Sequence, residues 1–263
     1  MIERVAAGVA IAAGIAYAAR AARALTTNGA LTATLIGLAA ITAGWSWGAL
    51  LIAFFLSSSA LSRIGLDIKH KRTSSILEKG GERDAVQVLA NGGVFALAGV
   101  GNLLAPWEGW FAIGGGALAA ATADTWATEL GTLSGATPRL ITTGRVVPAG
   151  TSGAVTPLGT LAMLLGSAFL TLCMIGVVWP RHVAMPSFAG GVLGALADSV
   201  AGATAQARRR CASCDALTER EVHSCGAYTV HAGGVAWLSN DAVNVLCSIV
   251  GAVTALIVAR ALA

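Results

Sequence analysis

The sequence predicts an all-α integral membrane protein, a polytopic bundle of about eight transmembrane helices with its long loops on one side. Of its 263 residues, 56% are hydrophobic and only 11% are charged, whereas soluble domains carry about 25% charged residues. The mean hydropathy is +0.73. The 33 glycines suit helices that pack closely in lipid, because small residues let backbones approach.

Eight apolar segments are long enough to cross the hydrocarbon core, which takes roughly 17 to 25 residues. The first could mimic a signal peptide, but its apolar run is long and begins at once, so we interpret it as a transmembrane helix. Residues 28–61 contain no charge and are too long for one span, and Trp45 and Trp47 are typical of an interfacial turn between two. The predicted spans are 2–19, 28–44, 45–61, 85–104, 107–123, 157–179, 187–207 and 235–259.

The charges separate between the two sides of this topology. The whole chain, 1–263, is predicted to be one membrane domain whose long loops, about 62–84, 124–156 and 208–234, share one side with fourteen of the 17 basic residues. The positive-inside rule predicts that these loops are cytoplasmic and that both termini lie outside. We expect the protein in the cell (plasma or inner) membrane. Because topology accounts for the formal charge of +4, we expect the lipid bilayer as a partner and no nucleic acid.

Three carboxylates stand out in apolar surroundings. Asp124 and Glu129 follow an uncharged run, and Asp198 lies about eleven residues into an uncharged helix. Such groups are costly unless a cation or metal satisfies them. Asp124 and Glu129 are about 140° apart on an ideal helix, so they converge only if the helix ends or bends, which Gly131 permits. Carboxylates are ligands that Mg²⁺ prefers, and we predict all three as catalytic magnesium ligands.

Other polar side chains follow helical spacing near the same membrane side. We predict that they shape a substrate or nucleotide site together with the carboxylates. These residues are Asn91, Thr125, Thr128, Gln206, Asn240 and Asn244. Asparagine, glutamine and threonine also serve simply as hydrogen-bonding contacts between membrane helices, and both interpretations stay open. Asp84 equally fits a plain helix N-cap.

Basic residues near the carboxylates are candidates for phosphate binding. They are Lys69, Lys71, Arg72 and Arg145. Such juxtamembrane cations also act as topology determinants or contact anionic lipids. The hydroxyl-rich segments 142–144 and 150–153 are small-residue loops that can turn backbone N–H groups onto phosphate, or they form an ordinary connector.

The third loop contains Cys211-x-x-Cys214 followed by His223-x-Cys225. Three thiols and an imidazole are the ligand types of one tetrahedral Zn²⁺, although the His-x-Cys spacing is tighter than in common zinc fingers. A structural zinc site and a set of reduced, unliganded cysteines are both compatible with the sequence. A cytoplasmic loop argues against a structural disulfide.

Several motifs together resemble one known family. They are Ala-Asp-Thr-Trp-Ala-Thr-Glu-Leu-Gly at 123–131, Pro-Arg-Leu-Ile-Thr at 138–142, Gly-Thr-Ser-Gly-Ala-Val-Thr at 150–156, Asp-Ser at 198–199 with Gly202, Ala203 and Gln206, and Asn-Asp-Ala-Val-Asn at 240–244. The chain resembles, from about residue 57 to 244, the integral membrane family, long of unknown function, that includes plant phytyl-phosphate kinase. It departs from the plant and animal pattern in its Cys/His loop and at Asp241, where those relatives have a second asparagine.

The resemblance implies a membrane-embedded kinase that uses a nucleoside triphosphate, with CTP as the first choice, and Mg²⁺ to convert an isoprenyl monophosphate of the phytyl or geranylgeranyl type to its diphosphate. Such a transfer needs metal and cations to offset phosphate charge, which agrees with the carboxylates and basic residues above. The alternatives are a CTP-dependent cytidylyltransferase acting on a lipid phosphate, or a lipid or solute transporter. The asymmetry of the loops argues against a carrier, and no convincing inverted repeat is present.

Overall fold

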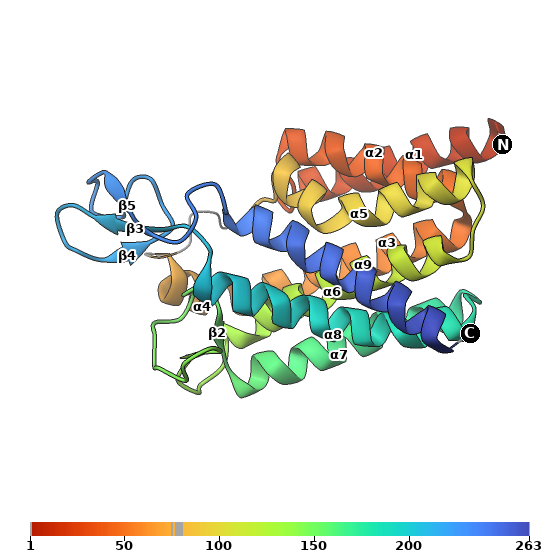
Figure 1. Cartoon of the computed structure of the whole chain (residues 1–263). Helices are drawn as coiled ribbons and strands as arrows, with labels where there is room; N and C mark the ends of the chain where they lie inside the picture. Colours follow the sequence, from red (N-terminus) through yellow and green to blue (C-terminus); the bar gives the residue numbers. More distant parts are fainter. Residues whose placement is uncertain (1, 75, 77–80, 263) are drawn as a thin grey trace.

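Eight long helices make up most of the part of the chain that the structure describes (Figure 1). The computed structural model describes residues 2–74, 76 and 81–262, so residues 75 and 77–80 of the first predicted loop lie outside the described residues. The long helices are α1 (Ile2–Ala21), α2 (Thr27–Ala43), α3 (Trp45–Arg63), α5 (Ala85–Leu104), α6 (Gly109–Gly131), α7 (Pro157–Gly176), α8 (Arg181–Thr204) and α9 (Asn240–Leu262). A short helix, α4 (Leu66–Thr73), lies between α3 and α5. The all-α class is confirmed.

Each predicted apolar segment is largely helical, although α8 ends at Thr204 instead of residue 207 and α9 begins at Asn240 instead of residue 235. The helices differ in how well they suit a bilayer. Six are long and apolar enough to cross a membrane, namely α1, α3, α5, α7, α8 and α9. Helix α2 is apolar but has only 17 residues, and the glycine- and alanine-rich α6 is not among the six found in the described part of the chain. The chain is thus an integral membrane bundle, and the count of eight spans stays a prediction.

The two ends of the bundle differ, as Figure 1 shows. Helix α4 and the short strands gather at one end, whereas both termini lie at the opposite end. The charge pattern predicted this segregation of long loops from termini. We refer below to the end with α4 and the strands as the loop end.

The central helix α6 packs closely against α8 and α9. A Cβ atom added at Gly190 of α8 would lie 2.5 Å from the carbonyl oxygen of Gly251 in α9, and one added at Gly251 would lie 2.5 Å from the carbonyl oxygen of Gly116 in α6. The three backbones therefore touch where each helix has a glycine, as small residues permit in membrane bundles. This crossing sets the positions of the polar residues farther along α6 and α8.

Helix α6 is longer than predicted, and this corrects the start of the second loop. The helix continues through Asp124 and Glu129 to Gly131 instead of ending at residue 123. Thr122 and Thr125 support this extension, since their hydroxyls donate to the carbonyls of Leu118 and Ala121 one turn earlier. The second loop therefore begins at residue 132, and both carboxylates belong to one continuous helix.

Trp47 is also placed differently from the prediction. It is only 1% exposed and its ring lies 5.0 Å from that of Phe95 and 4.9 Å from that of Trp179. Trp45, at 56% exposure, remains suited to an interfacial turn. Trp47 instead belongs to an aromatic core that joins α3, α5 and the α7–α8 connection, because its large apolar ring gains most from full burial.

Two loops contain small antiparallel sheets that the sequence did not reveal. In the 132–156 loop, β1 (Arg139–Leu140) pairs with β2 (Ala154–Val155). In the 208–234 loop, β3 (Arg208–Cys211) lies between β4 (Leu217–Thr218) and β5 (Thr229–Gly233). Both sheets lie at the loop end, beyond the helices (Figure 1).

Candidate functional site

A cavity of about 270 Å³ opens at the loop end of the bundle. Its walls come from the last turns of α6, the 138–156 loop and the first turns of α7. The C-terminal half of α8 and the start of α9 complete them. The predicted site residues that line it are Asp124, Thr128, Gln206, Asn240 and Asp198. Residues that are distant in sequence thus share one cavity, and the glycine-rich segment 150–153 forms part of its wall.

The helix crossing explains why Asp124 and Asp198 share the cavity. Each lies eight residues beyond a glycine of the crossing, Gly116 in α6 and Gly190 in α8. Eight residues correspond to about 12 Å along a helix, and both helices run toward the loop end. The two carboxylates therefore lie at about the same distance from the loop end, and they are close enough to interact electrostatically.

Asp198 has a buried carboxylate oxygen, Oδ2, without a hydrogen-bond partner among the described residues. The lining of the cavity includes no lysine or arginine among those residues. Since a buried carboxylate needs a cation or donors to offset its lost hydration, the pair Asp124 and Asp198 fits a hard divalent cation such as Mg²⁺ by donor chemistry.

The segment 150–153 approaches α8 closely. Gly153 has a φ of +74°, and a Cβ there would overlap the backbone nitrogen of Ala203. Its carbonyl accepts a hydrogen bond from the Ile141 amide at 3.0 Å. Gly150, with a φ of +89°, packs against Thr73 of α4. Small residues thus let this loop lie flat against α8 and line the cavity with backbone.

Glu219 is a site residue that sequence reasoning missed. Its Oε1 accepts hydrogen bonds from Gln206 Nε2 at 2.7 Å and from the Ser152 hydroxyl. Gln206 and Ser152 both line the cavity, and the negative charge of Glu219 also acts on Asp198. Nothing in the spacing of the 208–234 loop marked Glu219, because its position beside Ser152 arises only from the fold of β3 and β4.

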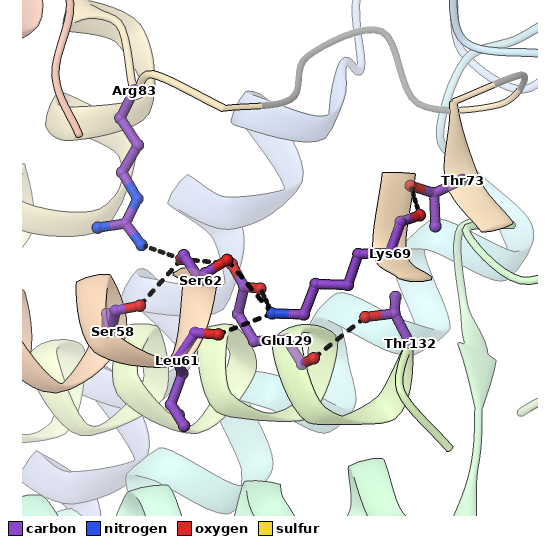
Figure 2. A network of polar contacts seen from close by, with 8 residues as sticks. All are labelled: Ser58, Leu61, Ser62, Lys69, Thr73, Arg83, Glu129 and Thr132. Carbon is purple, nitrogen blue, oxygen red and sulfur yellow. Dashed lines mark hydrogen bonds and ion pairs between the residues drawn. The ribbon is translucent and has the colours of Figure 1, made fainter. Parts of the chain in front are cut away.

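Glu129 does not share the cavity of Asp124. Figure 2 shows it between α3 and α4, where its Oε2 lies 2.5 Å from Lys69 Nζ. Its Oε1 accepts a hydrogen bond from the Ser62 hydroxyl at 2.5 Å. The condition for convergence with Asp124, an end or bend of the helix, is not met. The structure thus divides the predicted carboxylates into a cavity pair and a separate ion pair.

Arg83 joins this second group. Its Nη2 donates to Ser62 Oγ at 3.1 Å (Figure 2). Burial lowers the pKa of Arg83, and the nearby charge of Glu129 opposes that shift. Lys69 also donates to the Leu61 carbonyl at 2.7 Å. Lys69 and Arg83 are therefore both engaged with α3, and Lys69 is also engaged with α6.

The remaining predicted residues lie around the cavity or apart from it. Arg72 donates to the carbonyls of Thr132 and Ser134 at 2.9 and 2.8 Å, and the side chains of Lys71 and Arg145 are exposed. Thr125 bonds within α6, and Asn244 is half-buried in α9. Asn91 lines a different cavity of about 90 Å³, mostly apolar, between α1, α2, α3 and α5. Asp84 caps α5 through a reciprocal capping box with Gln87.

The four candidate zinc ligands converge. One potential ligand atom from each of Cys211, Cys214, His223 and Cys225 lies within 4.8 Å of all the others. A hydrogen bond from the Cys214 backbone amide lowers the pKa of the Cys211 thiol to about 7. The cluster belongs to the loop that contains Glu219.

A helical membrane bundle with a carboxylate-lined cavity at one end defines the general class of this protein. The family comparison is more specific, since residues 10–252 match the model described as integral membrane protein DUF92. The chain belongs to this family, and the family prediction from its motifs is confirmed. No solved structure matches the chain.

The relatives include plant and archaeal proteins. The chain is 35% identical over 248 residues to Protein PGR of Arabidopsis thaliana, covering 84% of each chain. It is 32% identical over 239 residues to an uncharacterized membrane protein of Methanocaldococcus jannaschii, covering 89% of this chain and 85% of that one. It is 29% identical over 240 residues to Protein VTE6, chloroplastic, of Arabidopsis thaliana, covering 89% of this chain and 65% of that one.

Proposed function

We propose that this protein is a membrane-embedded kinase that transfers a phosphoryl group from a nucleoside triphosphate, CTP in the first instance, to an isoprenyl monophosphate. The observation that carries the proposal is the pairing of Asp124 with Asp198 in one cavity beside the 150–153 loop. The reaction class follows from the resemblance to the family that includes plant phytyl-phosphate kinase. We expect the loop end on the cytoplasmic side, because fourteen of the 17 basic residues fall on that side of the predicted topology.

The residues of the cavity suit the charge distribution of this reaction. Asp124 and Asp198 would hold Mg²⁺, whose positive charge would offset the negative charge of the donor phosphates. A cation is needed there since the described lining is acidic and offers no basic side chain. The exposed cations Lys71 and Arg145 are proposed to contact the outer phosphates of the nucleotide.

The acceptor needs little more than positioning. A phosphate monoester is ionised near neutral pH and is itself the nucleophile, so the transfer depends chiefly on alignment and electrostatic stabilisation. Thr128 offers a hydroxyl in the cavity, and Met163 and Leu196 give it an apolar wall. We propose that the wall contacts the isoprenoid tail and that the Thr128 hydroxyl orients the phosphate.

Product analysis tests this function. Purified protein in detergent is incubated with Mg²⁺, CTP and phytyl or geranylgeranyl monophosphate, and the lipid product is weighed by mass spectrometry. We expect the diphosphate, reduced about 100-fold or more in Asp124→Asn and Asp198→Asn, since losing one electrostatic contact to a transferring group costs about 10²–10³ in rate. Glu108→Gln, at the other end of α6, is the control and keeps full activity.

The other outcomes separate the alternatives. A product heavier by a CMP group would overturn the kinase in favour of cytidylyl transfer at the same site. Consumption of no nucleotide with any acceptor or donor, combined with nucleotide-independent lipid flux in liposomes, would overturn both enzymes in favour of a transporter.

A further inference from the structure

We propose that Cys211, Cys214, His223 and Cys225 bind one Zn²⁺, and that this ion holds the β3–β5 sheet so that Glu219 stays at the rim of the cavity. The proposal concerns a part of the chain that the proposed phosphoryl transfer does not use. It joins two observations, the geometry of four ligand atoms and the contacts that the segment between them makes with the cavity.

The ligand geometry matches a tetrahedral site. Zinc bonds of about 2.3 Å to sulfur and 2.0–2.1 Å to nitrogen place tetrahedral ligands about 3.5–3.8 Å apart. Cys225 Sγ lies 3.4 Å from Cys211 Sγ and 3.9 Å from Cys214 Sγ. His223 Nδ1 lies 3.3 Å from Cys214 Sγ and 3.2 Å from Cys225 Sγ. Each separation is near the value that a single ion requires.

Two tight turns produce this convergence. The residue after each second ligand has a positive φ, +59° at Asp215 after Cys214 and +85° at Gly226 after Cys225. The Asp215 amide donates to the Cys211 carbonyl at 3.1 Å, and the Gly226 amide donates to the His223 carbonyl at 2.8 Å. Each turn thus directs its two ligands to one point, which also accommodates the short His-x-Cys spacing.

The sheet is small, since its strands β3, β4 and β5 contain 4, 2 and 5 residues. Metal binding supplies folding free energy in small domains, because the site forms only in the folded state. A bound ion would therefore add to the stability of this loop.

The segment between Cys214 and His223 contacts the cavity rim. Glu219 accepts from Gln206 and Ser152, and Arg220 Nη1 donates to the Ser74 carbonyl at 3.0 Å. The Glu219 amide donates to the Ile76 carbonyl at 2.9 Å. Zinc would thereby fix the ends of a segment that connects the C-terminal end of α4 with the 150–153 loop.

Metal content tests the site. Protein purified without chelators is assayed for zinc by mass spectrometry and, after exchange, for a thiolate-to-cobalt absorption band. We expect one zinc per chain in the wild type and in the control Cys173→Ser, whose thiol lies in α7. We expect at least a tenfold loss in Cys214→Ser and Cys225→Ser. A wild type without zinc or a cobalt band, or with a Cys211–Cys225 disulfide by intact mass, would overturn the proposal.

Hydrogen exchange tests the link to the cavity. Glu219→Ala is expected to keep its zinc yet raise exchange at least tenfold at the Thr151 and Ala154 amides, which bond within this loop. Glu219→Gln, which can still accept from Ser152, is expected to restore most of the protection, and Glu221→Ala is the control. Unchanged exchange in Glu219→Ala would refute the positioning role. Neither readout uses kinase activity, so failure here is distinct from failure of the proposed function.

Discussion

Lys69 Nζ lies 2.5 Å from Glu129 Oε2, so an ion pair ties the short helix α4 to the central helix α6. The two side chains are only 11% and 22% exposed. Removing either charge would therefore leave the other largely buried without a counter-charge. The pair also fixes the orientation of α4, whose Thr73 contacts Gly150 at the cavity. A carboxylate predicted as a metal ligand thus has a clear structural partner.

We predict that Glu129→Gln lowers the free energy of unfolding by about 3 kcal/mol, because it leaves the Lys69 ammonium buried without its counter-charge. Thermal unfolding in detergent measures the effect. Glu82→Gln is the control, since the Arg20–Glu82 pair is 3.6 Å long and more exposed and such pairs contribute at most about 1 kcal/mol. If the Glu129→Gln protein has normal stability but is no longer stabilised by Mg²⁺, the result would support Glu129 as a metal ligand instead.

We predict that Mg²⁺ stabilises the wild type against heat but not Asp198→Asn or Asp124→Asn. A ligand at 100 times its Kd adds about 2.7 kcal/mol, and each variant removes one of the two carboxylates that would hold the ion. The melting temperature is measured with and without Mg²⁺, with Glu108→Gln as a variant that retains the shift. An equal shift in Asp198→Asn would exclude this residue as a ligand.

Gly153→Ala is predicted to displace the 150–153 loop and reduce both stability and activity. The added methyl would overlap the Ala203 backbone, and the φ of +74° disfavours any side chain. Gly144→Ala provides a matched control, because Gly144 has a φ of +67° but no atom within 4 Å of its Cβ position among the described residues. In the control, the free energy of unfolding should fall only by about 1–2 kcal/mol, which is the cost of placing a side chain at a positive φ. Equal unfolding curves for the two variants would contradict close packing at Gly153.

Gly116→Ala is predicted to separate α6 from α9, since its methyl would overlap the Gly251 carbonyl. Overpacking of this kind typically costs about 1–3 kcal/mol, and it would also shift Asp124 relative to Asp198. Gly93→Ala in α5 points into open space among the described residues and should be neutral or stabilising by up to about 1 kcal/mol. A Gly116→Ala protein as stable as Gly93→Ala would show that the crossing can relax.

Much of the fold could be predicted because hydropathy and charge are local properties. Each predicted apolar segment is largely helical, and the basic residues correctly grouped the long loops at one end, away from the termini. The hydroxyl- and glycine-rich segment at 150–153 was likewise marked by its composition, and the structure places it in the cavity wall with Asp124 and Asp198. The motifs were also sufficient to identify the family.

Which polar residues contact one another depends on how the helices pack. Asp124 and Glu129 are about 140° apart on α6, and only the packing of α8 on one side and α3 with α4 on the other gave them different partners. Glu219 reached Ser152 through the fold of a sheet that no sequence periodicity announced. The pattern of apolar, polar and charged residues was enough to specify the helices, the polar end of the bundle and the residue types of the site. The assignment of each side chain to a cavity, an ion pair or a cysteine cluster required the three-dimensional contacts, because hydrogen bonds and ion pairs act only over a few ångströms.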